Sequence, residues 1–282
     1  ASAGLFFCGQ GKRGAGAATM PVATAMQDRA RSMHTPKPRP PATRQAPRHG
    51  LARVLSKLGV CSRSQAERAV RGGRVTVDGR VTLDPERPTD PARQRIALDG
   101  QPVAAASRVY VALNKPRGIV TTAADERGRD TVYDLLRDAG LPWLGPVGRL
   151  DKASEGLLLL SNDSAWAAGL TDPQRHVDKT YHVQIDAIPD PSMLDRLTQG
   201  VTDEGERLAA KRVSLLRSGT RNAWLEVVLD EGRNRHIRRL LAVHGIGVLR
   251  LIRVAIGGLA LGELPKGQWR HLDEEEVAAL RR

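Results

Sequence analysis

Cysteine, paired metal ligands and long apolar runs are scarce or missing in this sequence. The 282 residues include only two cysteines, Cys8 and Cys61, too few for a disulfide framework or a cysteine-rich zinc site. The seven histidines are scattered and form no HExxH pattern or other paired-ligand spacing. No apolar run approaches the about 18 residues of a membrane span. These absences predict a cytoplasmic protein without a metal site or a membrane anchor.

Positive charge, by contrast, is abundant. The formal net charge is +13, which favours a polyanionic partner, RNA or DNA, over a membrane. A basic, soluble enzyme is the alternative. Residues 1–50 hold eight of the Lys and Arg residues and one acid, so the other 232 residues carry 36 bases and 30 acids. Local patches of charge are therefore more informative than the total.

The N-terminal 49 residues have the composition of a tail. The stretch "TPKPRPPATRQAPRHG" is rich in Pro and Arg and has too few apolar residues to form a core. We therefore expect residues 1–49 to be a disordered basic tail. An organelle transit peptide, which is also Arg-rich and poor in acids, is the alternative.

Residues 50–105 are predicted to form a small unit of two helices and short strands. Leucine and valine recur at helical spacing over 51–58, and Gly59 ends that helix. Ser62 is placed to cap a second helix. Asp78-Gly79 and Asp99-Gly100 are turn signals between short apolar runs.

The two predicted helices carry bases on their polar faces. Bases three or four residues apart lie on one face of a helix, and two such helices side by side can follow a phosphate backbone. A solvated helix face is the alternative, but such a face usually contains more acids than the single Glu67 found here. We predict nucleic-acid contacts at Arg53, Lys57, Arg63, Arg68 and Arg71.

Residues 106–282 are predicted to form a larger α+β unit. Predicted strands outnumber predicted helices and seldom alternate with them, which indicates a mostly antiparallel sheet. Helices are expected over 131–140, 163–170, 190–200, 234–245 and 273–282.

A charged run precedes the most apolar strand of this unit. In "GRLDKASEGLLLL", Asp151 lies just before a run that must be buried. Burial alone would raise the pKa of this carboxyl group, whereas a neighbouring cation would lower it and keep the group ionised. Arg149 and Lys152 are local cations. An aspartate that only caps a turn is the alternative.

Two other features could act with that carboxylate. In "EGRNRHIRRL", Arg235, Arg238 and Arg239 form a predicted basic stripe beside an apolar one, and arginine is well suited to hold an ionised aspartate. Surface ion pairs or phosphate contacts are the alternative. Tyr181 is one of three tyrosines; its ring could support an unstacked base or could belong to the core.

Taken in order, these motifs resemble the bacterial ribosomal RNA pseudouridine synthases that carry an S4 RNA-binding domain before the catalytic domain. The resemblance covers roughly residues 50–282. It includes "SRSQAERAVRGGRVTVDGR" for the S4 part. For the catalytic part it includes "LNKPRGIVTT", "GRLDKASEGLLLLSND", "DKTYHV" and "DEGRNRHIRRLLAVHGIGVLRLIRVAIGGLALGELPKGQWRHL". It implies a small S4-like domain over 50–105 and a mostly antiparallel catalytic domain over 106–282.

The resemblance also implies roles for single residues. Asp151 matches the catalytic aspartate and Tyr181 the active-site tyrosine. Arg238 matches the arginine that pairs with the aspartate, with Arg235 and Arg239 as alternatives. Arg149 matches an arginine that can fill the space left by the flipped base. His236 is a departure, because the family often has glutamine there. We assign Lys115, Arg235 and Arg239 to RNA contact.

The resemblance implies an isomerase that needs no cofactor and no metal. Its expected partner is ribosomal RNA or a pre-ribosomal particle, and we expect a monomer. A uridine of 23S rRNA is the preferred target, with 16S rRNA as the alternative. Two other hypotheses remain at this point: a non-catalytic ribosome-assembly protein, and a DNA-binding regulator that uses residues 50–105 as a helix-turn-helix.

Overall fold

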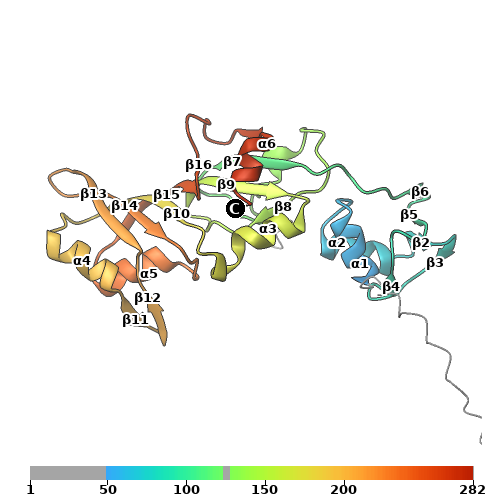
Figure 1. Ribbon diagram of the computed structural model, residues 1–282, viewed down its shortest axis with the longest axis horizontal. Coiled ribbons are helices and arrows are strands. Elements are labelled where there is room, and N and C mark those ends of the chain that lie inside the picture. Colours follow the sequence, from blue (N-terminus) through green and yellow to red (C-terminus); the bar gives the residue numbers. More distant parts are fainter. Residues whose placement is uncertain (1–48, 123–127, 282) are drawn as a thin grey trace, which may run out of the picture. The chain divides into compact units, whose positions relative to one another are not determined.

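A computed structural model describes residues 49–122 and 128–281 (Figure 1). The predicted N-terminal tail lies outside these residues, apart from His49. Within the described ranges, no helix combines the length and the apolar content that crossing a membrane requires.

The first part of the described chain has its own hydrophobic core. Helix α1 (Leu51–Lys57) packs beside α2 (Arg63–Arg71), and the Ser62 side chain caps α2 as predicted. Both helices cover a small antiparallel sheet in the order β3-β2-β5-β6. Its strands are β2 (Val75–Val77), β3 (Arg80–Val81), β5 (Ile96–Leu98) and β6 (Gln101–Pro102), and a separate pair joins β1 (His49–Gly50) to β4 (Pro88–Thr89).

A single large sheet organises the rest of the chain. Its main path runs β13-β14-β10-β15-β9-β7-β17, with β16 beside β15 and β8 beside β9. Its strands pair antiparallel, except that β9 and β15 are parallel. The strands are β7 (Tyr110–Lys115), β8 (Gly145–Val147), β9 (Glu155–Ser161), β10 (Lys179–Ile185), β13 (Arg212–Ser218), β14 (Ala223–Leu229), β15 (Val248–Ile256), β16 (Leu259–Ala260) and β17 (Trp269–His271). The predicted α+β class, with a mostly antiparallel sheet, is confirmed.

Helices cover the two ends of this sheet and form separate cores. Helices α4 (Pro191–Gln199) and α5 (His236–Val243) pack against β10, β13, β14 and β15. Helices α3 (Ser164–Thr171) and α6 (Glu274–Ala279) pack against β7, β8 and β9. Aspartates at 163, 190 and 273 cap three of these helices through their side chains, so local sequence sets where these helices begin.

The structure differs from the local predictions at three places. The helix expected over 131–140 is only a short 3-10 turn, Asp134–Leu136. Helix α5 begins at His236, because Arg235 has the left-handed backbone conformation (φ 50°) and lies just outside it. A hairpin of β11 (Val201–Asp203) and β12 (Glu206–Leu208) was not predicted, since its strands are too short and polar to show an apolar pattern.

The parallel contact between β9 and β15 depends on one glycine. Gly156 pairs with Arg253 and has a φ of 99°. A Cβ atom at residue 156 would lie 2.2 Å from the carbonyl oxygen of Arg253, so only glycine permits this approach. The contact fixes the start of β9, and with it the loop that carries Asp151, against the middle of β15.

Candidate active site

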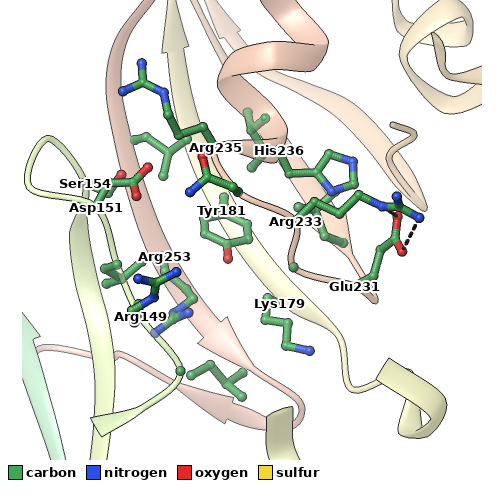
Figure 2. A pocket seen from close by; sticks show the side chains of 18 of the residues that line it. Arg149, Asp151, Ser154, Lys179, Tyr181, Glu231, Arg233, Arg235, His236 and Arg253 are labelled. Atoms are coloured by element: carbon green, nitrogen blue, oxygen red, sulfur yellow. Dashed lines mark hydrogen bonds and ion pairs between the residues drawn. The ribbon is translucent and has the colours of Figure 1, made fainter. Parts of the chain in front are cut away.

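A cavity of about 330 Å³ lies where the loop before β9, strands β10 and β15 and the start of α5 meet (Figure 2). Tyr181 and Leu251 belong to its lining, and most of its charged side chains are cationic. These charged residues are Arg149, Asp151, Lys179, Glu231, Arg233, Arg235, Arg238 and Arg253. The structure therefore brings all four predicted catalytic residues (Asp151, Tyr181, Arg238 and Arg149) to one pocket.

Asp151 lies at the edge of this pocket and is exposed to solvent. Within the described residues its carboxylate has neither a hydrogen bond nor an ion pair, although its backbone is bonded. In Figure 2 its side chain lies across the pocket from Glu231. The carboxylate is thus accessible to a substrate and surrounded by positive charge.

The backbone of the Asp151 loop (residues 150–154) is held by buried Lys115. This side chain is fully buried in β7, and its Nζ donates to the carbonyl oxygens of Pro116, Asp151 and Ser154 at 3.1, 3.2 and 2.9 Å. Burial lowers the pKa of Lys115 to about 8, against the opposing charges of Asp151 and Glu155. An ammonium group in this position is not available to a phosphate. The predicted RNA contact at Lys115 therefore does not fit the structure, which gives Lys115 a positioning role.

The other carbonyl groups of the Asp151 loop are also bonded. Three donors reach them from separate segments: Thr121 Oγ1 to Leu150 at 2.9 Å, Gly118 N to Lys152 at 2.8 Å and Arg238 Nη2 to Ala153 at 3.2 Å. Each carbonyl oxygen from residue 150 to 154 thus accepts a hydrogen bond, and the loop has little freedom to move. A carboxylate on such a loop is preorganised.

Arg238 acts on this loop rather than pairing directly with Asp151. Its guanidinium also donates to the carbonyl oxygen of Val248 at 3.3 Å, and within the described residues no ion pair within 4.0 Å joins it to Asp151. Burial lowers the pKa of Arg238, as does the nearby charge of Arg235, while the charge of Asp151 raises it. The predicted direct pairing is therefore replaced by a backbone contact two residues further along and a longer-range attraction.

Tyr181 comes from the middle of β10 and lies half-buried in the pocket. Figure 2 shows its ring between the Asp151 loop and the Glu231 segment. Lys179 precedes it by two residues and faces the same side of the sheet. Burial lowers the pKa of Lys179, and the charge of Arg253 lowers it further. The ring is thus bordered by cations and is free to stack on a base.

The other predicted arginines of this region divide into two kinds. Arg149 and Arg235 are exposed, and the side chain of neither forms a hydrogen bond or an ion pair within the part of the chain that the structure describes. Arg239 instead bonds Asp203 at 2.6 Å and Glu206 at 2.5 Å, both on the β11–β12 hairpin. Its guanidinium is occupied by these acids, so the predicted RNA contact at Arg239 does not fit.

The five bases predicted on the N-terminal helices are all exposed. Arg63 forms ion pairs with Glu67 and Glu86 at 3.3 and 2.9 Å, and Lys57 contacts His49 at 3.0 Å. Across residues 49–122 and 128–281, the side chains of Arg53, Arg68 and Arg71 have no hydrogen bond or ion pair. These three arginines are the ones most available to phosphates.

Sequence reasoning missed several charged pocket residues, of which Arg253 is the most buried. It lies in the stretch "VLRLIRVAI", in which every residue except the two arginines is apolar, and a buried arginine is unusual in such a strand. That exception was the signal that could have identified it. Among the described residues no three His, Cys, Asp or Glu side chains form a group suited to a metal ion.

Comparisons with known proteins agree with this geometry. Residues 109–243 match the RNA pseudouridylate synthase family, and residues 50–91 match the S4 domain. An uncharacterized RNA pseudouridine synthase of Aquifex aeolicus is 35% identical over 82% of this chain and 92% of its own length. Ribosomal large subunit pseudouridine synthase B of Bacillus subtilis is also 35% identical, over 82% of this chain and 95% of its own length.

A solved structure has the same fold. A crystal structure of a pseudouridylate synthase is 28% identical and covers 82% of this chain and 99% of its own, with a TM-score of 0.58.

Proposed function

The chain belongs to the RNA pseudouridylate synthase family and is an isomerase, and on that premise we propose that it converts one uridine of 23S ribosomal RNA to pseudouridine with Asp151 as the reacting carboxylate. The observation that carries the assignment of Asp151 is its setting. It is an exposed carboxylate, unpaired among the described residues, on a loop whose carbonyl groups are all bonded, at the edge of a cationic pocket.

The reaction requires one carbon–nitrogen bond to break and one carbon–carbon bond to form. The bond between ribose C1′ and uracil N1 breaks, the ring turns, and uracil C5 joins C1′. The C5 proton is lost and N1 gains a proton. The Asp151 carboxylate supports either of two routes: attack on C1′ as a nucleophile, or removal of a ribose proton as a base. No electron acceptor is needed in either route, because the product is an isomer of the substrate.

The uridine must leave its stack before it reaches Asp151. Extruding a base costs roughly a few kcal/mol. The ring of Tyr181 offers a new stacking surface, and Arg149 and Arg235 at the rim can bind the flanking phosphates. The exposed arginines of α1 and α2 add sequence-independent attraction to the RNA.

The choice of 23S rRNA follows the relatives. The Bacillus subtilis protein is described as acting on the large ribosomal subunit, and it covers most of this chain. The S4 domain match over 50–91 supports an RNA partner for the exposed bases of α1 and α2.

The test is to map pseudouridine in unmodified 23S and 16S transcripts after incubation with the purified protein. We expect one new site in 23S rRNA with the wild-type protein and none with Asp151→Asn. Loss of turnover should be at least about 10³-fold, within the range for a positioned acid–base group, while RNA affinity stays near wild type.

Three results would change the proposal. A new site in 16S rRNA alone would reassign the target and leave the role of Asp151 intact. Full isomerisation by Asp151→Asn would remove the role assigned to that carboxylate. No product on either RNA, nor on ribosomal particles from a strain that lacks the gene, would reject a ribosomal substrate.

A further inference from the structure

The pocket contains a buried arginine, Arg253, that has no role in the proposed reaction as described above. Arg253 is 5% exposed, and it lies on β15 opposite Gly156. Its Nε donates to the carbonyl oxygen of Leu157 at 2.7 Å. This bond and the parallel contact with β9 fix the guanidinium at the base of the pocket.

One end of this guanidinium is left without an acceptor. Among the described residues, no group accepts a hydrogen bond from the buried Nη2 atom of Arg253. A buried, unsatisfied donor on a charged group is costly, and proteins keep such groups mainly where they serve a function. Arg253 also lines the pocket, so a group of the substrate is a candidate acceptor for this donor.

The side chains near Arg253 in the pocket include further cations, which favour the binding of an anion. Lys179 is close enough for the two charges to affect each other, and Arg149 lines the same pocket. Figure 2 shows the side chains of Arg149 and Arg253 on one side of the pocket, both below Asp151. Neither Arg149 nor Arg253 has an ion pair within the described residues. An unneutralised cluster of cations stabilises negative charge placed beside it.

We propose that Arg253 is a catalytic residue that stabilises the uracil anion formed when the bond to ribose breaks. This inference rests on the proposed function. The electron pair of the C1′–N1 bond stays with N1, and the charge spreads to the O2 and O4 oxygens of the ring. Arg253 Nη2 donates to one of these oxygens while Asp151 acts on the ribose. Attack of C5 on C1′ makes the ring neutral. The C5 proton is then lost while N1 gains a proton from solvent, which gives the isomer.

The position of Arg253 explains why it meets the base rather than a phosphate. The residue is almost completely buried, whereas Asp151, Arg149 and Arg235 are exposed at the rim. A flipped nucleotide enters base first and leaves its phosphates at the rim. The close contact of Gly156 with Arg253 holds the start of β9, which follows the Asp151 loop, against β15. The distance between Arg253, which acts on the base, and Asp151, which acts on the ribose, is therefore fixed.

Arg253 would contribute to the rate as a preorganised hydrogen-bond donor placed where negative charge develops. Removing one such donor typically lowers the rate roughly 10²–10³-fold. Both routes open to Asp151 expel uracil as an anion, so the role of Arg253 holds for either.

The test compares two leaving groups. Single-turnover rates are measured for Arg253→Gln, Arg253→Lys and wild type on the RNA that the wild-type protein modifies, and on the same RNA with 5-fluorouridine at the target. Loss of the starting nucleoside is followed by mass spectrometry of nuclease digests, and RNA affinity by filter binding. Arg221→Gln is the matched control, because Arg221 is exposed in the turn before β14 and does not line the pocket.

The fluorine atom stabilises the uracil anion without help from the protein. We therefore expect Arg253→Gln to lose roughly 10²–10³-fold in rate on uridine and several-fold less on 5-fluorouridine. RNA affinity should change little. Arg253→Lys keeps the positive charge, so its rate should fall less than that of Arg253→Gln, and the fall should again be larger on uridine than on 5-fluorouridine. Arg221→Gln should have the wild-type rate on both substrates.

Equal rate losses on both substrates, or a loss confined to affinity, would overturn the proposal and leave the isomerase assignment standing. A wild-type rate in Arg253→Gln would do the same. If Arg253→Gln does not fold, as judged by circular dichroism, the rate losses of Arg253→Lys on the two substrates test the proposal in its place. Equal losses on uridine and 5-fluorouridine would then overturn it. Absence of turnover by the wild-type protein on every RNA would instead contradict the proposed function.

Discussion

Two helical regions of this protein are both rich in arginine, but the arginines have different environments. The α1–α2 region carries Arg53, Arg68 and Arg71 on exposed faces without partners among the described residues. The α5 region carries Arg238 and Arg239, whose guanidinium groups bind the backbone and the acids of other segments. For both regions the sequence predicted a basic helix face.

The difference shows that spacing alone does not assign a role to a basic residue. Around α1 and α2, the nearby acids Glu67 and Glu86 form ion pairs with Arg63. The other arginines of these helices have no such partner among the described residues, so they are available to a ligand. Around α5, the β11–β12 hairpin presents Asp203 and Glu206 to Arg239, and the Asp151 loop presents a carbonyl oxygen to Arg238. The first region is suited to bind RNA, and the second to hold the active site together.

Among the variants that test this comparison, we expect the largest effect from Arg238→Ala, on the single-turnover rate. This change removes two hydrogen bonds to backbone carbonyls and a positive charge that acts on Asp151. We expect the single-turnover rate to fall about 10²-fold, as for loss of one preorganised electrostatic group, with RNA affinity nearly unchanged. If affinity falls and the rate does not, Arg238 is a phosphate contact and the contrast with α1–α2 disappears.

The second effect concerns RNA affinity. Replacing both Arg68 and Arg71 by glutamine removes two exposed charges from α2. We expect Kd to rise about tenfold at moderate salt, and the slope of log Kd against log salt to fall by about 0.7–0.9 for each phosphate that the variant no longer neutralises. The single-turnover rate at saturating enzyme should stay at the wild-type value. An unchanged salt slope would show that these arginines only solvate the helix.

A smaller effect is expected from Arg239→Ala, and on stability instead of affinity. The change leaves Asp203 and Glu206 without their shared partner and loosens the hairpin from α5. We expect the thermal midpoint to fall by a few degrees. The salt slope of RNA binding should equal that of the wild type. A reduced salt slope in Arg239→Ala would restore the RNA contact predicted from the sequence.

The smallest effect concerns acid stability and His236. Burial lowers the pKa of this histidine from 6.5, so below that pH the unfolded chain binds a proton that the folded chain does not. Stability from this group is therefore present above pH 6.5 and is lost as pH falls through the window below it. Urea unfolding at several pH values should show a shallower loss of stability in acid for His236→Gln than for wild type. Parallel curves would mean that His236 does not titrate with folding.

The elements of the fold were largely predictable because their signals are local. The capping aspartates and Ser62, the apolar run of β9 and the turn at Asp78-Gly79 each act within a few residues. The exceptions had no such signal: the strands of the β11–β12 hairpin are three residues each, and the short 3-10 turn at Asp134–Leu136 has a sequence that also suits a longer helix.

The candidate site was predictable in part. The order of the motifs indicates Asp151, Tyr181 and Arg149 as pocket residues, and the structure places them around one cavity. The RNA contacts predicted for Lys115 and Arg239 do not fit, because a sequence shows that a residue is charged but not which group lies beside it. Arg253 was not predicted, because the group that its side chain contacts, the Leu157 carbonyl, lies 96 residues away along the chain.

By itself the sequence determined most of the helices and strands and the positive charge of the exposed surfaces, and it indicated Asp151 as the candidate carboxylate. Tertiary structure alone decided which bases stay free and which are bound within the protein. Lys115, Arg238, Arg239 and Arg253 each bind a group that lies between 36 and 96 residues away along the chain. A hydrogen bond depends on distance in space, and bonds at such separations exist only after the sheet has formed.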